Sequence, residues 1–281
     1  MTDYTTGRVH SPDGTAIGFR EYGSGPGLIL LHGGMKAAQH FSTLAGALGG
    51  DFRVYVPDRR GRGMSGPHGD DFSVRREVED MQALVAATGA RFVFGLSSGA
   101  LVSLRTALFT ESLERVALYE PPLSVHGSAP TAWVPRFDRE IAAGRPAAAL
   151  VTALKGGDID PLFGRLPRWV LAPIMAVGLR TQTGRAGEVA IADLIPTQHF
   201  DMRIVRDMAD TAPDYARLRA RVLLLGGTKS ADYFGVALGE LADVLPHAKR
   251  VTLRGLTHEG PEDDGDPLVV AQVLRDFFAA P

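Results

Sequence analysis

Short apolar runs alternate along most of the chain with longer amphipathic stretches. The apolar runs with strand character cover residues 27–31, 53–56, 91–94, 115–119, 221–225 and 250–253. Stretches with helical spacing cover residues 37–48, 74–87, 100–109, 233–244 and 268–278. This alternation is typical of a mostly parallel sheet with helices on both faces, so the pattern predicts an α/β fold.

Two further extended pieces precede these runs, at residues 8–10 and 16–22. They flank Ser11-Pro12-Asp13-Gly14, whose residue types favour a tight turn. We therefore expect an antiparallel hairpin to open the sheet, which brings the total to about eight strands.

The alternation of strand and helix patterns stops between residues 121 and 211. This segment shows several helical patterns with no strand between them, and it is interrupted by Pro130, Pro135, Pro146, Pro161, Pro167, Pro173 and Pro196. The strand-helix alternation resumes at Arg221. The pattern predicts a core made of residues 1–120 and 212–281, with a helical lid of residues 121–211 inserted after the sixth strand.

Composition removes several classes of function. A net charge of -2 disfavours binding to nucleic acid or to an anionic membrane, since both need a concentrated basic face. The 281 residues include no cysteine, which excludes disulfides, thiolate metal sites and a thiol nucleophile. No secretory signal or membrane-length apolar run is found, so we expect a cytoplasmic protein without membrane contact. A homodimer stays open.

The segment Gly95-Leu96-Ser97-Ser98-Gly99 carries the strongest chemical signal. It follows an apolar strand pattern and precedes a helical one, which is the context of a nucleophile elbow. Such a turn lifts the serine hydroxyl clear of the sheet, so Ser97 is the candidate nucleophile. The backbone N–H of Ser98 then lies at the new helix N-terminus, where it can stabilise an oxyanion.

A dinucleotide-binding site is the first competing interpretation. Residues 61–66 match G-x-G-x-x-G after a strand, but Pro67-His68-Gly69 follows instead of a helix that would receive a pyrophosphate. The chain also has no P-loop and no H-E-x-x-H motif. We therefore expect neither a cofactor nor a metal ion.

Four motifs together carry a family resemblance. They are His32-Gly33-Gly34 after a strand, Asp58-Arg59-Arg60-Gly61-Arg62-Gly63-Met64-Ser65 matching D-x-R-G-x-G-x-S, Gly95-Leu96-Ser97-Ser98-Gly99, and Gly255-Leu256-Thr257-His258. In this order they resemble the α/β-hydrolase family, in its lid-bearing, esterase-like branch, over nearly the whole chain. The resemblance implies a serine hydrolase that cleaves an ester-type bond, and it assigns the second oxyanion donor to the Gly34 N–H.

The position of His258 selects it among the eight histidines. It follows the last predicted strand, and catalytic groups collect at the carboxyl ends of strands in open α/β sheets. We assign it the role of general base toward Ser97 and then of general acid. His32 is interpreted as a structural residue.

The acid that would orient His258 has two candidates. The usual family position follows the next-to-last core strand, where this chain has Lys229, and Asp232 comes late in that loop. Ser230 or Asp232 is instead expected to cap the next helix. Glu120, at the end of the strand after the nucleophile helix, is the preferred candidate. The competing interpretation is that Glu120 pairs with Arg60 or Arg62.

The predicted lid supplies large apolar side chains. Trp133, Trp169 and Phe200 are the candidates for contact with a small-molecule substrate that has an apolar portion, although such residues more often belong to a core. Since fold does not fix chemistry, a non-hydrolytic role as a lyase, a cyclase or a small-molecule binding protein stays the alternative.

Overall fold

The computed structural model describes residues 3–158, 166–181, 187–245 and 247–279. Its single sheet has eight strands: β1 Thr5–His10, β2 Ala16–Tyr22, β3 Gly27–Leu31, β4 Arg53–Pro57, β5 Phe92–Leu96, β6 Arg115–Tyr119, β7 Arg221–Gly227 and β8 Lys249–Leu253. They follow the order β1-β2-β4-β3-β5-β6-β7-β8. Strand β2 is antiparallel to β1 and β4, and the remaining pairs are parallel. The predicted sheet and its opening hairpin are confirmed.

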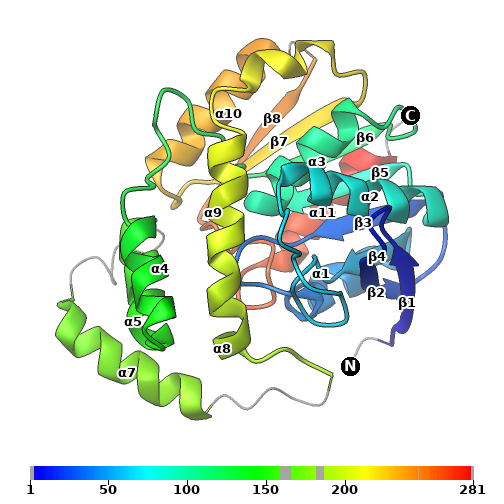
Figure 1. Ribbon diagram of the computed structural model, residues 1–281. Helices are drawn as coiled ribbons and strands as arrows, with labels where there is room; N and C mark the ends of the chain where they lie inside the picture. The colour runs from blue at the N-terminus through cyan, green and yellow to red at the C-terminus, as the bar shows by residue number, and fades with distance from the viewer. Residues whose placement is uncertain (1–2, 159–165, 182–186, 246, 280–281) are drawn as a thin grey trace.

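Helices cover both faces of this sheet (Figure 1). Helices α2 Val74–Thr88, α3 Ser98–Leu108 and α10 Asp232–Val244 share one apolar cluster with the sheet. The short helix η1 Ala38–Phe41 with α1 Ser42–Leu48 and α11 Pro267–Ala279 share the cluster on the opposite face. Strands buried on both faces need a continuous apolar run, which explains why β3, β5 and β6 were visible in the sequence.

The described residues between β6 and β7 form helices and no strand. The elements are α4 Val134–Ala142, α5 Pro146–Gly156, α7 Arg168–Thr181, α8 Ile191–Leu194, η2 Ile195–Thr197, α9 Gln198–Asp207 and η3 Ala212–Arg217. Helix α9 packs on α2 and α3, whereas α4, α5 and α7 lie farther from the sheet (Figure 1). That these helices act as a lid stays a prediction.

Burial divides these helices into an inner and an outer part. Ile204 and Val205 of α9 belong to the main apolar cluster, but Trp169 and Ile174 of α7 are exposed. Because exchange follows local opening, we expect the amides of α7 to exchange at least about tenfold faster than those of α9. Hydrogen–deuterium exchange measured by mass spectrometry checks this, and equal protection of the two helices would contradict it.

Candidate active site

Ser97 is the single residue between β5 and α3. Its backbone adopts φ 55 and ψ -126, a conformation that costs energy for a residue with a Cβ. The backbone packs closely after this turn: a Cβ on Gly99 would lie 2.4 Å from the carbonyl oxygen of His32, so only glycine fits there. The strand therefore runs two residues further than predicted, and the helix begins two residues earlier. This arrangement has the geometry of a nucleophile elbow.

His258 and Glu120 lie together at the same edge of the sheet. Nδ1 of His258 is 2.7 Å from Oε2 of Glu120, while Oε1 accepts a hydrogen bond of 2.6 Å from the Gly227 N–H. Glu120 is buried, and an ionised carboxylate can only accept, so Nδ1 carries the proton. Nε2 is thereby left as the acceptor. Phe234 stacks on the imidazole with ring centroids 4.3 Å apart and fixes its plane.

The roles weighed for Asp232 and for Glu120 other than orienting His258 are not the ones that the structure shows. Asp232 is exposed and is the first residue of α10, whose N-cap is Ala231 with no side-chain cap hydrogen bond. The predicted capping role of Ser230 or Asp232 is therefore wrong. Glu120 does not pair with Arg60 or Arg62, because these arginines bind Asp80 and Asp201. Of the two acids, the structure places Glu120 against His258.

The residues predicted to supply oxyanion donors flank Ser97. Ser98 begins α3, and Gly34 follows β3 in the same corner. His32 is buried, with Nδ1 donating to the Gly33 carbonyl oxygen at 3.0 Å and Nε2 accepting from the Arg59 N–H at 3.3 Å. Burial, together with the charges of Arg62 and Arg59, lowers the pKa of His32 well below its usual value. A neutral histidine held in this way has a structural role.

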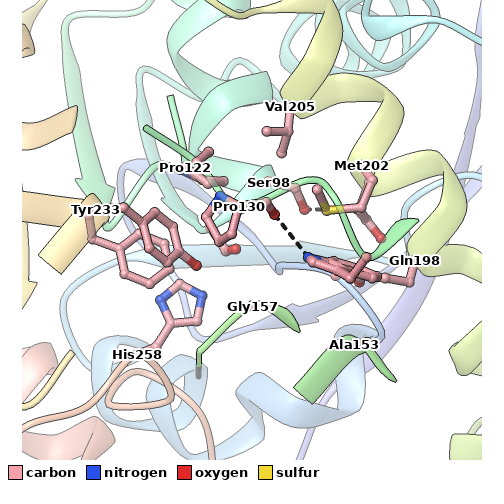
Figure 2. A pocket seen from close by; sticks show the side chains of 16 residues that line it. Ser98, Pro122, Pro130, Ala153, Gly157, Gln198, Met202, Val205, Tyr233 and His258 are labelled. Atoms are coloured by element: carbon pink, nitrogen blue, oxygen red, sulfur yellow. Dashed lines mark hydrogen bonds between the residues drawn. The ribbon is translucent and has the colours of Figure 1, made fainter. Parts of the chain in front are cut away.

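Two adjoining cavities meet at Ser97. They measure about 60 Å³ and about 170 Å³, and both are lined by Gly34, Ser97, Gln198 and His258. Figure 2 shows the smaller one, with Tyr233 and His258 on one side and Gln198 and Met202 of α9 on the other. A carbonyl group that reaches Ser97 would thus have space for a small substituent on either side.

The three aromatic residues predicted to contact the substrate lie in different surroundings. Trp133 lines the smaller cavity, where its indole N–H donates to the Pro130 carbonyl oxygen at 2.9 Å. Trp169 is 78% exposed, and Phe200 stacks on His68 with centroids 3.6 Å apart. Neither of these two lines the cavities at Ser97. We correct the prediction for two of them: Trp169 faces solvent and Phe200 is a packing residue. Contact between Trp133 and a substrate stays a prediction.

The larger cavity carries an ion-pair cluster. Lys36 contacts Glu262 and lies 3.7 Å from Glu259. Burial lowers the pKa of Lys36, but the two carboxylates outweigh it and the net shift is upward. Burial raises the pKa of Glu262. Among the described residues that line the two cavities, Lys36 is the sole lysine or arginine, and it is already paired.

A second ionic cluster lies behind Ser98 and was missed by sequence reasoning. Arg59, Arg62, Glu77 and Asp201 are all buried there. Arg59 binds Glu77 and Asp201, and Arg62 binds Asp201. Asp201 comes from α9, and no local pattern links it to arginines about 140 residues earlier. The surrounding sequence is rich in charged residues at both places, so no signal in it marks Asp201 or Arg62 as buried.

Metal-ligating clusters and membrane-spanning helices are both absent from the described residues. Within residues 3–158, 166–181, 187–245 and 247–279, no group of three or more histidine, aspartate or glutamate side chains is arranged to hold a metal ion. The helices of these same ranges include none with the length and apolar character needed to cross a bilayer.

Solved structures and curated proteins give independent comparisons. An α/β hydrolase from Sphaerobacter thermophilus is 32% identical, with a TM-score of 0.78, over 97% of this chain and all of that one. An enol-lactonase from Burkholderia xenovorans superposes with a TM-score of 0.72 at 22% identity, over 97% of this chain and all of that chain, and shows the fold alone.

Curated relatives match shorter segments. The N-formylmaleamate deformylase of Pseudomonas putida is 33% identical over 45% of this chain and 49% of its own length. The 3-hydroxybutyrate-oligomer hydrolase of Cupriavidus necator is 37% identical over 32% of each chain. The chain therefore spans about half or less of the length of these curated relatives. The model of the "Alpha/beta hydrolase family" matches residues 28–273, and the chain belongs to the α/β-hydrolase family.

Proposed function

We propose that the protein is a serine hydrolase that cleaves an ester-type bond through an acyl-enzyme on Ser97. The observation that carries the proposal is the Glu120–His258 pair beside an elbow serine, all at the carboxyl edge of one sheet. Relatives that act on an ester oligomer and on an N-formyl group support a hydrolytic role. The bond class in this chain is part of the proposal.

The mechanism follows from the hydrogen bond between Nδ1 of His258 and Glu120, which leaves Nε2 free to accept a proton. Nε2 of His258 accepts the Ser97 hydroxyl proton while Oγ attacks the substrate carbonyl carbon, and the carbonyl electron pair moves onto oxygen. The N–H groups of Ser98 and Gly34 stabilise that oxyanion. Collapse of the intermediate breaks the bond to the leaving group, which takes the proton from His258. Water then repeats the sequence on the acyl-enzyme and releases the acid.

Glu120 supports both half-reactions. Its carboxylate keeps the Nδ1–H tautomer in place and stabilises the imidazolium formed in each transition state. The Gly227 N–H holds the second carboxylate oxygen, so the acid cannot rotate away without losing that hydrogen bond. The three side chains therefore act as one unit, with Ser97 as nucleophile, His258 as base and acid, and Glu120 as the orienting group.

The test of the bond class is a substrate panel. We expect 4-nitrophenyl esters with acyl chains of about two to four carbons to be turned over faster than long-chain esters, because the cavities at Ser97 are small. Matched thioesters, lactones and anilides rank the bond types by kcat/KM. An enzyme active on the anilides and inactive on every ester would refute the ester assignment.

A second prediction concerns substrate charge. Lys36, the one lysine or arginine among the described residues that line the cavities, is already paired with two glutamates, Glu259 and Glu262. The described lining residues offer an anionic group no free counter-ion, so a neutral 4-nitrophenyl butyrate should exceed 4-nitrophenyl hemisuccinate by about tenfold or more in kcat/KM.

The half-exposed Glu259 supplies the matching control variant. Glu259→Gln removes one negative charge at the cavity and should narrow the difference between the two esters. A wild-type preference for the hemisuccinate would contradict the prediction.

The alternative is a non-hydrolytic use of the same fold. The intact arrangement of Ser97, His258 and Glu120 favours hydrolysis, because a binding protein has no need for an oriented histidine beside a serine. A fluorophosphonate discriminates between the two roles. Labelling of the native protein that is lost after heat denaturation supports the hydrolase, whereas a native protein that resists labelling favours the alternative.

A further inference from the structure

Arg59 binds several buried side chains behind Ser98, one of the two predicted oxyanion donors. It occupies the variable second position of D-x-R-G-x-G-x-S, whereas the arginine of that motif, Arg60, binds Asp80 and Asp13 elsewhere. The Arg59 guanidinium is buried and makes two hydrogen bonds of 2.9 Å to Glu77. Its Nη1 donates to Asp201 at 2.8 Å and to the Ser98 hydroxyl at 3.0 Å.

Asp201 closes a ring with Ser98 and Arg59. The Ser98 hydroxyl donates to Oδ1 of Asp201 at 2.8 Å, the same oxygen that accepts from Arg59. The second oxygen accepts from Nη2 of Arg62 at 2.5 Å. Every member is buried, so these bonds are shielded from water and are strong. The side chain of the residue that begins α3 is thus held by a carboxylate from α9.

Helix α9 also touches the other oxyanion residue. A Cβ on Gly34 would lie 2.4 Å from Oε1 of Gln198 and 3.2 Å from Oδ2 of Asp201. The side chains of the first turn of α9 therefore lie close to Gly34. The same helix thus lies beside both residues that are predicted to supply oxyanion donors.

The charges make this arrangement rigid. Arg59 and Arg62 balance Glu77 and Asp201, so the cluster is neutral as a whole. Burial alone would raise the pKa of Asp201, but Arg62, Arg59 and the Ser98 hydroxyl lower it to about 2. The carboxylate is therefore ionised at every working pH. Moving α9 away from the core would remove Asp201 and leave the buried Arg62 guanidinium without its carboxylate partner, which is strongly unfavourable.

We propose that Asp201 is a positioning residue that holds Ser98 beside Gly34, so that the N–H groups of these two residues converge on the oxyanion. In this arrangement α9 is a fixed wall of the active site, and any movement of the lid is confined to α4, α5 and α7. The inference rests on the proposed function for its kinetic readout, because it assumes that an oxyanion forms at Ser97.

The experiment compares two neutralised carboxylates that contact α9. Asp201→Asn keeps the shape of the side chain and removes its charge. Asp138→Asn is the matched control, since Asp138 binds His199 of α9 at 2.9 Å, both side chains are partly exposed, and neither lines the two cavities. Ser98→Ala removes the hydroxyl and leaves the backbone N–H, so it tests the same contact if Asp201→Asn does not fold.

The expected result is a loss confined to the transition state. Asp201→Asn should lower kcat by about 10- to 100-fold with KM changed less than about threefold, since slight misplacement of an oxyanion donor costs rate rather than substrate binding. Affinity for a trifluoromethyl ketone, which forms an oxyanion on the serine, should fall in parallel. Ser98→Ala should show a smaller loss of the same kind, and Asp138→Asn should stay within about twofold of wild type.

Hydrogen–deuterium exchange gives a readout that does not depend on activity. The peptides that contain Gly34 and Ser98 should exchange faster in Asp201→Asn than in wild type, and at the wild-type rate in Asp138→Asn. Unchanged exchange and unchanged kcat in Asp201→Asn and Ser98→Ala would overturn the inference. A wild-type protein that neither labels at Ser97 nor turns over any ester would instead refute the proposed function, and the exchange result would still decide whether Asp201 positions the corner.

Discussion

Replacing Ser97 with alanine is expected to lower kcat by about three decades or more, because the attacking oxygen is lost while the elbow persists. The strained backbone at this position depends on the packing of Gly99 against His32, which the substitution does not touch. The melting temperature should therefore change little. Steady-state kinetics on the best ester of the panel, with circular dichroism to confirm folding, measure the effect.

The control for this variant is a serine that has no part in the site. Ser112 is exposed in the turn after α3, so Ser112→Ala should keep wild-type kinetics. A Ser97→Ala protein with kcat within about tenfold of wild type would show that another group performs the attack. Nucleophilic catalysis by Ser97 would then be ruled out.

Glu120→Gln is expected to lower kcat by about two to four decades. The glutamine oxygen can keep the hydrogen bond from the Gly227 N–H, which turns the amide nitrogen toward His258. That nitrogen is a donor, so Nδ1 must become the acceptor and the proton moves to Nε2. Nε2 then cannot take the proton from Ser97, and the histidine is in the wrong tautomer for catalysis.

Asp232→Asn provides the internal comparison. Asp232 is exposed in the first turn of α10, so its neutralisation should cost a few tenths of a kcal/mol of stability and leave kcat near wild type. The reverse outcome, with Asp232→Asn inactive and Glu120→Gln active, would place the acid at the usual family position. Matched pH–rate profiles of the two variants show whether the histidine titration or only the rate is affected.

The centre of the sheet was predictable because β3, β5 and β6 are buried on both faces. Strands β3 and β6 begin and end where the apolar runs do, at Gly27–Leu31 and Arg115–Tyr119. The boundary at the nucleophile was less predictable, since the turn consists of Ser97 alone and the strand and helix patterns merge across it. Position along the chain sufficed to bring Glu120 and His258 to one edge, because parallel strands end on the same side.

The contacts of the segment between β6 and β7 could not be predicted in the same way. Trp169 and Phe200 are large apolar residues of the kind that line pockets. Trp169 nevertheless faces solvent, and Phe200 stacks on His68. Asp201 meets Arg59 and Ser98 through packing of α9 on α3, which has no signature in spacing. Helical periodicity determines which residues share one face of a helix, but the element against which that face packs is decided by the tertiary structure.

The most direct test of the central claim is to trap the acyl-enzyme. Acid quenching within the first turnovers of a 4-nitrophenyl ester, followed by peptide mass spectrometry, should find the acyl mass on the peptide that contains Ser97, with a burst of nitrophenolate of up to one equivalent when deacylation is slow. Glu120→Gln should yield a slower burst at the same site. An acyl group on a different residue, or a nitrophenolate burst that leaves no acyl group on Ser97, would contradict covalent catalysis by this serine.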